Sequence, residues 1–201
     1  MMKSFFCFVL LLMLSFVSCK ESSVIEPIVE KTIVINNFEV QKKDLVLNQI
    51  EGKWYYKNEP FNGFSVKHHP NGILSEKMGY LNGKREGVAK RWEPDGTLRI
   101  QSYYKQNRLV GSYKVWWQNG ELAEESTYVD GALEGTQKMW YPNGILAKER
   151  QLSNGKEKGL QKAWLQNGKL YVNYEAKNGR IFGMRRANSC YQLEDEVVIR
   201  N

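Results

Sequence analysis

Histidine is scarce in this sequence of 201 residues, and its scarcity limits the chemistry that the chain can support. The two histidines, His68 and His69, are adjacent, so the sequence offers no credible ligand set for zinc. It also lacks a Gly-x-Ser-x-Gly motif, which carries the nucleophile of many hydrolases. We therefore expect no catalytic residue, no metal and no cofactor, and we interpret the chain as non-enzymatic.

The N-terminus has the pattern of an export signal. Lys3 precedes an apolar run over residues 5–14, which is too short to span a membrane. The sequence FVSC over residues 16–19 resembles the bacterial lipobox, with Phe where Leu is usual. This resemblance implies cleavage before Cys19 and acylation of Cys19, which would anchor the chain durably in a membrane. The alternative is an ordinary secretory signal that is cleaved.

Cysteine is also scarce, and its distribution excludes an intrachain disulfide in a processed chain. Cys7 lies within the signal and Cys19 is the expected lipidation site, so Cys190 is left alone. We interpret Cys190 as a half-buried residue of a terminal cap, with a redox or metal-thiolate role as the alternative.

The balance of charge is basic. Loss of residues 1–18 removes one lysine and no acid, which lowers the formal net charge from +7 to +6. Such a charge suits anionic lipid, polysaccharide or nucleic acid, and it also suits a solvated surface with surplus lysine. Because the chain is exported, we expect no nucleic-acid partner.

Glycine recurs at a fixed interval of 24 residues, and this is the strongest signal in the sequence. The leading series is Gly63, Gly87, Gly111, Gly135, Gly159 and Gly183. The first-turn series is Gly72, Gly96, Gly120, Gly144 and Gly168. The second-turn series is Gly83, Asn107, Gly131, Gly155 and Gly179. A period of this length indicates a repeat architecture, and repeat arrays mostly bind partners along an extended surface.

Each repeat contains two Asn-Gly or Asp-Gly type turns between short aromatic and β-branched runs. Such turns predict β-hairpins, because a type I′ turn needs positive φ at both central residues. Asn107 replaces glycine tolerably, since Asn enters the left-handed region more easily than most residues. A two-residue turn at Asn119-Gly120 places Lys114 opposite Glu125 and Trp117 opposite Leu122.

Two further residue series predict which side chains pack between the hairpins and which could bind a partner. Tryptophan recurs five residues after the leading glycine, at Trp92, Trp116, Trp140 and Trp164, and leucine recurs after each first turn. These residues are interpreted as a hydrophobic spine, with an aromatic binding stripe as the functional alternative. Lysine recurs at one repeat position, at Lys90, Lys114, Lys138 and Lys162, and this row is the candidate binding surface for an anionic polymer or headgroup layer. The alternative is a solvated face that Glu125 and Glu149 partly neutralise.

The repeat pattern G-x-x-x-x-W-x-x-N-G-x-L-x-x-E-x-x-Y-x-N-G, best matched over residues 111–131 and 135–155, resembles the MORN repeat variant of the YwqK family. Pro60-Phe61-Asn62-Gly63 resembles the turn that begins the array in that family. The resemblance implies an all-β fold, a long single-layer antiparallel sheet of tandem 24-residue hairpins. Members of the family are often labelled antitoxins of toxin–antitoxin systems.

These patterns together predict the organisation of the chain. We expect a lipoprotein signal over residues 1–18, a tether over 19–31, an N-terminal cap with an opening hairpin over 32–62, five repeats over 63–183 and a C-terminal cap over 184–201.

The expected function is non-catalytic binding of a macromolecular partner, a protein or an envelope polymer, by a protein anchored at the bacterial cell envelope, at the outer membrane. The alternative is an antitoxin or immunity-like protein that binds and neutralises a toxin. A glycan hydrolase using Glu124, Glu125 or Glu149 is the third hypothesis, and we expect these carboxylates to pair with lysines instead.

Overall fold

The computed structural model describes residues 34–184. The predicted signal, Cys19, the tether and Cys190 lie outside the described residues, as does the predicted C-terminal cap apart from Met184. None of the described residues forms a helix long and apolar enough to cross a membrane.

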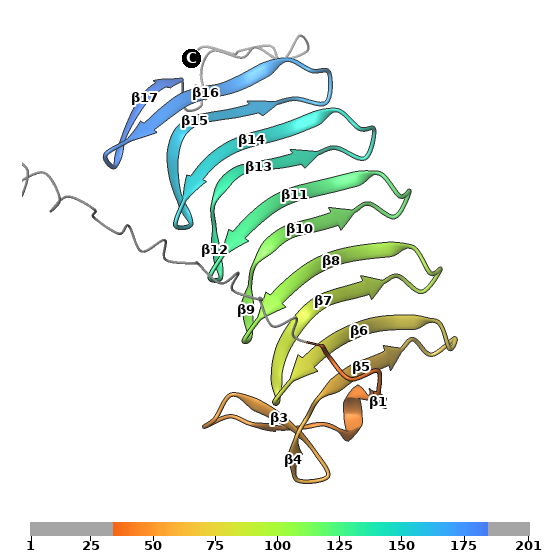
Figure 1. Ribbon diagram of the computed structural model, residues 1–201. Coiled ribbons are helices and arrows are strands. Elements are labelled where there is room, and N and C mark those ends of the chain that lie inside the picture. Colours follow the sequence, from red (N-terminus) through yellow and green to blue (C-terminus); the bar gives the residue numbers. More distant parts are fainter. Residues whose placement is uncertain (1–33, 185–201) are drawn as a thin grey trace, which may run out of the picture. The chain divides into compact units, whose positions relative to one another are not determined.

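The described chain forms one fourteen-stranded sheet and a separate three-stranded sheet (Figure 1). The main path of the large sheet runs, in spatial order, through β1 (Glu39–Gln41), β5 (Gly63–His68), β6 (Leu74–Leu81), β7 (Lys84–Trp92), β8 (Leu98–Lys105), β10 (Gly111–Trp116), β11 (Leu122–Val129), β13 (Gly135–Trp140), β14 (Leu146–Ser153), β15 (Lys156–Trp164), β16 (Leu170–Lys177) and β17 (Arg180–Met184). The short strands β9 (Arg108–Leu109) and β12 (Ala132–Leu133) pair with β8 and β11. The predicted all-β fold of tandem hairpins in one long sheet is confirmed.

The N-terminal segment adds a part that the repeat pattern does not contain. Strand β1 pairs with β5 in parallel, whereas the other pairs in the large sheet are antiparallel. A 3-10 turn (Lys42–Asp44) then leads to the small sheet of β2 (Val46–Asn48), β3 (Lys53–Tyr56) and β4 (Glu59–Pro60). This small sheet docks on the first repeat, where Trp54 N–H donates to Gly83 O at 2.7 Å and Gly83 N–H donates to Phe61 O at 2.8 Å.

The turns of the second series have the predicted type I′ geometry. Both central residues have positive φ at Asn82-Gly83, Gln106-Asn107, Asp130-Gly131, Asn154-Gly155 and Asn178-Gly179. Asn107 also has a contact that explains why it stands in a glycine series. Its side-chain amide donates to Gly52 O, in the turn between β2 and β3, at 2.8 Å, and its Oδ1 accepts from Arg85 N–H at 2.8 Å.

The turns of the first series differ from the prediction. Gly120 has φ +83°, but Asn119 is not among the residues with positive φ. Gly120 N–H donates to Trp117 O at 2.9 Å and Trp117 N–H donates to Glu121 O at 2.8 Å, which describes a three-residue loop rather than a two-residue one. The extra residue shifts the register, so Trp116 and not Trp117 lies opposite Leu122, while Lys114 faces Glu125 as predicted.

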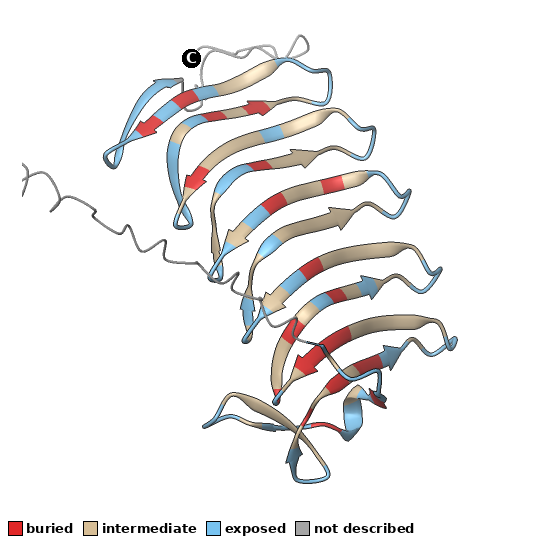
Figure 2. Cartoon of the chain, viewed as in Figure 1, coloured by how far each residue is buried: buried red, intermediate tan, exposed pale blue. Residues whose placement is uncertain are grey.

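The core is concentrated at the N-terminal end of the sheet, on β5–β7 (Figure 2). Phe61 and Tyr80 are buried there, with ring centroids 5.6 Å apart, and Trp54 packs against Tyr80. Further along the sheet most side chains are only half-buried, as expected for a single layer whose faces both meet solvent (Figure 2). Stability there therefore depends on contacts between neighbouring hairpins.

The two faces of the sheet differ in burial. Lys90, Lys114, Lys138 and Lys162 occupy one register row, and because side chains alternate along a strand this row defines one face, here called the lysine face. The adjacent row lies on the opposite face, here called the network face. The buried members of this adjacent row are Val40, Ser65, Met78, Ala89, Ser102, Ser126, Gln137, Gln161 and Tyr174.

Candidate functional site

The predicted lysines are brought into one continuous row that crosses the large sheet. From β6 to β16 the row reads Lys77, Lys90, Gln101, Lys114, Glu125, Lys138, Glu149, Lys162 and Asn173. The four predicted lysines are two strands apart, which separates neighbours by about 9–10 Å. The spacing suits an extended partner.

Carboxylates neutralise the middle of this row. Lys114 Nζ lies 2.9 Å from Glu125 Oε1, and Lys138 Nζ lies 3.9 Å from Glu149 Oε2. All four of these side chains are partly exposed, so the pairs contribute little stability. At the ends of the row, Lys90 lies opposite Lys77 and Gln101, and Lys162 lies opposite Glu149 and Asn173. Lys77 forms an ion pair with Glu39, so the positive charge in excess rests on Lys90 and Lys162.

The predicted tryptophans lie at the first-turn edge of the sheet. Each is opposite a leucine of the same hairpin, in the pairs Trp92–Leu98, Trp116–Leu122, Trp140–Leu146 and Trp164–Leu170. All four tryptophans are half-buried. They contribute apolar contact within each hairpin and leave part of each ring accessible.

The backbone of each tryptophan has a second role, which the sequence pattern did not indicate. The carbonyl oxygen of Trp140 accepts a hydrogen bond from Trp117 Nε1 at 3.0 Å, and that of Trp164 accepts one from the Tyr141 hydroxyl at 2.9 Å. The preceding repeat thus supplies a side-chain donor to the next repeat. The equivalent residue of the second repeat is Glu93, and there Arg99 donates to Trp116 O.

The second-turn edge has a matching series of backbone bonds. Gly131 N–H donates to Leu109 O and Gly155 N–H donates to Leu133 O, each at 2.8 Å. Asn107 N–H donates to Arg85 O in the same way. Each hairpin is therefore tied to its neighbour at both edges, beyond the strand ladders themselves.

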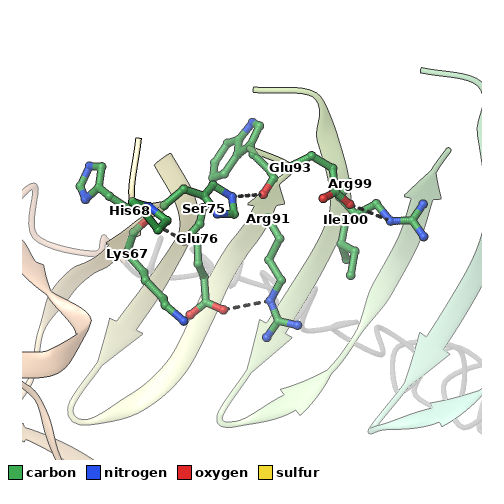
Figure 3. A pocket seen from close by; sticks show the side chains of 11 residues that line it. Lys67, His68, Ser75, Glu76, Arg91, Glu93, Arg99 and Ile100 are labelled. Carbon is green, nitrogen blue, oxygen red and sulfur yellow. Dashed lines mark hydrogen bonds and ion pairs between the residues drawn. The ribbon is translucent and has the colours of Figure 1, made fainter. Parts of the chain in front are cut away.

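A hollow of about 560 Å³ lies between the first two repeats (Figure 3). Glu76 and Arg91 point toward one another across it, with Arg91 Nε 2.9 Å from Glu76 Oε2. His69 Nε2 is 2.8 Å from Trp92 O, and Arg99 Nε is 3.3 Å from Glu93 Oε1. These polar groups are satisfied by one another, so they serve the contact between repeats rather than forming a set of convergent free groups.

The carboxylates that a glycan hydrolase would need do not converge. Glu124 and Glu125 are successive residues of β11, so their side chains point to opposite faces. Glu124 accepts hydrogen bonds from Ser126 and Gln137, while Glu125 and Glu149 lie beside lysines. Within residues 34–184, no group of three or more His, Cys, Asp or Glu side chains is positioned to hold a metal ion.

Lys42 is the lysine with a large pKa shift in the described part of the chain. Burial lowers its pKa to about 8, against the opposing attraction of the Glu76 carboxylate. Its ammonium lies 3.6 Å from the centroid of the Trp54 ring and donates to the Tyr80 hydroxyl. A perturbed lysine can mark a reactive site. Here, packing between the N-terminal segment and the first repeat accounts for the shift.

Comparison with known families finds a match to three of the repeats. Residues 85–106, 109–130 and 133–154 match the family model of the MORN repeat variant. These three segments correspond to the hairpins β7–β8, β10–β11 and β13–β14. MORN repeats are generally non-catalytic modules. No curated protein matches the sequence.

Proposed function

We propose that this chain is an envelope-anchored, non-catalytic repeat lipoprotein that binds a macromolecular partner, a protein or a cell-envelope polymer, along the lysine face of its sheet. The observation that carries the proposal is the single row of regularly spaced lysines on a sheet of repeated hairpins. Exposed apolar side chains flank this row: Val88, Tyr103 and Leu160 are 36%, 37% and 50% exposed. Apolar and cationic groups together suit a macromolecular contact.

The mixture of lysine and glutamate in the row favours a partner that is recognised by the positions of its charges rather than by its total charge. Lys114 and Lys138 lie beside Glu125 and Glu149, so the middle of the face presents alternating charge. Alternating charge selects a partner with a complementary pattern and disfavours unpatterned polyanions. The repeats place these charges at regular intervals along the sheet, so a partner with the same spacing of charges fits this face.

The lipid anchor is the part of the proposal that decides the compartment. Cys19 lies 15 residues before the first described residue, Val34. Acylation of Cys19 would therefore leave residues 20–33 between the lipid and the first described residue. An antitoxin of cytoplasmic toxins is the alternative that the resemblance implies, and it requires that the chain is not exported.

Labelled palmitate separates these alternatives. We expect the wild type to incorporate palmitate and to fractionate with membranes, and we expect Cys19→Ala to lose both properties. Cys7→Ala is the matched control, because it removes a cysteine upstream of the cleavage point and leaves Cys19 in place. A wild-type protein that is soluble, unlabelled and still carries residues 1–18 would contradict the anchoring and favour the antitoxin.

A further inference from the structure

Asparagine followed by glycine recurs through the sheet, and this pair can react with itself. The backbone nitrogen of the glycine attacks Cγ of the asparagine, ammonia leaves and a five-membered succinimide remains. Glycine favours the attack because it has no side chain to hinder it. Water then opens the ring to aspartate or isoaspartate. The described chain has eight such pairs, at Asn62, Asn71, Asn82, Asn119, Asn143, Asn154, Asn167 and Asn178.

Hydrogen bonds hold five of these eight asparagine side chains. In the four first turns that contain the pair, the asparagine Oδ1 accepts from the N–H two residues later, at 3.0–3.2 Å. The glycine N–H of each of these turns donates as well, to the residue three positions earlier, at 2.9 Å. Asn62 Oδ1 accepts from Asn36 N–H at 3.3 Å. Both reacting groups of the first turns are therefore held away from one another.

The three remaining pairs lie in second turns and share one local geometry. Asn82, Asn154 and Asn178 are exposed and have φ of +50°, +49° and +52°. Each pair is followed by a lysine or an arginine. None of the three side chains has a hydrogen-bond partner among residues 34–184. Because sequence and turn type match, a difference in reactivity between these pairs must come from their surroundings.

The glycine N–H separates the last of these pairs from the other two. Gly155 N–H donates to Leu133 O, and Gly83 N–H donates to Phe61 O, each at 2.8 Å. Gly179 N–H has no hydrogen-bond partner within the part of the chain that the structure describes. The last second turn is therefore the exception in the series of backbone bonds at this edge of the sheet.

The position of this turn in the array acts in the same direction. Strand β17 pairs with β16 alone within residues 34–184. Its side chains Ile181 and Phe182 are 40% and 54% exposed, so little packing holds the strand. A hairpin with one neighbour opens more often than a hairpin inside the array. Succinimide formation requires the backbone of the turn to rearrange, so its rate follows the population of the open turn.

We propose that Asn178 is a spontaneous modification site, which converts to aspartate and isoaspartate faster than the other Asn-Gly asparagines of the folded protein. The Gly179 nitrogen bonds to Cγ of Asn178, and its proton leaves with the side-chain amide as ammonia. Water then adds to one carbonyl of the ring, and one C–N bond of the ring breaks. The net change replaces an amide by a carboxylate, with one water consumed and one ammonia released. The site is independent of the function proposed for the lysine face.

Conversion would change the end of the sheet. Lys177 and Arg180 are paired across the two-residue turn. Isoaspartate lengthens the backbone by one carbon atom, and a type I′ turn has no room for it. The product also carries a new negative charge. The reaction would therefore release β17 from β16 as the protein ages.

Peptide mapping by mass spectrometry, during incubation of the purified full chain in mildly alkaline buffer, tests the proposal. We expect Asn178 to convert at least about fivefold faster than Asn154, which is the effect of one lost hydrogen bond on the population of the open turn. Asn82 is the second internal control, because Gly83 N–H is bonded. In urea the three asparagines should convert at similar rates, since no turn then protects them.

Asn178→Gln is the matched variant for the effect on the sheet. Gln106 occupies the equivalent position with φ +50°, so the turn should accept glutamine, whose longer side chain does not form the five-membered ring. Hydrogen exchange in β17 should rise with age in the wild type and stay constant in the variant. Conversion at another Asn-Gly pair as fast as at Asn178 in the folded protein, no conversion at Asn178, or an equal rise of exchange in the variant would each overturn the proposal.

Discussion

Replacing Gly83 with alanine is expected to lower the free energy of unfolding by about 3 kcal/mol, because the new side chain meets two obstacles. Gly83 has φ +76°, a conformation that costs an L-residue about 1–2 kcal/mol. A Cβ atom at this position would also lie 2.8 Å from Trp54 O and 2.9 Å from Lys53 Cβ. Strand β3 must move away to accept it, which disturbs the docking of the small sheet.

Gly131→Ala is the matched control for this substitution. Gly131 occupies the same turn position two repeats later, with φ +87°, and a Cβ atom there would meet nothing within 4 Å. We expect Gly131→Ala to lower the free energy of unfolding, measured in urea, by about 1–2 kcal/mol, which is the cost of the positive φ alone. Equal losses for the two variants would mean that contact between the small sheet and the Asn82-Gly83 turn contributes nothing to stability.

Replacing Trp140 with alanine is expected to cost about 2–3 kcal/mol, since it removes a large half-buried ring from its contact with Leu146. The backbone carbonyl of Trp140, which accepts from Trp117, stays in place. The loss of unfolding free energy in Trp140→Ala therefore measures the contribution of the side chain alone. Because each hairpin contacts only its neighbours, hydrogen exchange should increase most in β11, β13 and β14.

Lys138→Ala is the comparison for Trp140→Ala in the same strand. Lys138 is 44% exposed and lies 3.9 Å from Glu149, so its loss should change the free energy of unfolding by less than about 0.5 kcal/mol. Similar small effects for both substitutions would contradict the structural role assigned to the tryptophan series.

The repeat fold could be predicted because its main determinant is local. Each Asn-Gly or Asp-Gly pair sets a turn without reference to distant residues, and the 24-residue spacing then fixes the hairpins. The spacing could not reveal that Asn119 keeps a negative φ, since the loop length depends on the bulge that follows Gly120. The predicted tryptophan–leucine pairing was wrong by one residue for that reason.

The candidate functional residues also differ in whether the sequence alone could predict them. A row of lysines at one repeat position follows from the period alone, and the structure places those lysines in one register row. The hydrogen bonds to the tryptophan carbonyl groups could not be predicted, because the donor changes from repeat to repeat, from Arg99 to Trp117 to Tyr141.

Binding of a macromolecular partner along the lysine face is the central claim, and photo-crosslinking in cells tests it most directly. Benzoylphenylalanine would replace Tyr103 or Leu160, which are exposed on the lysine face, or Gln118, which is exposed at a turn. The account predicts a light-dependent adduct of one defined partner at Tyr103 and Leu160 and none at Gln118. No adduct at either position on the lysine face, or the same adducts at Gln118, would contradict it.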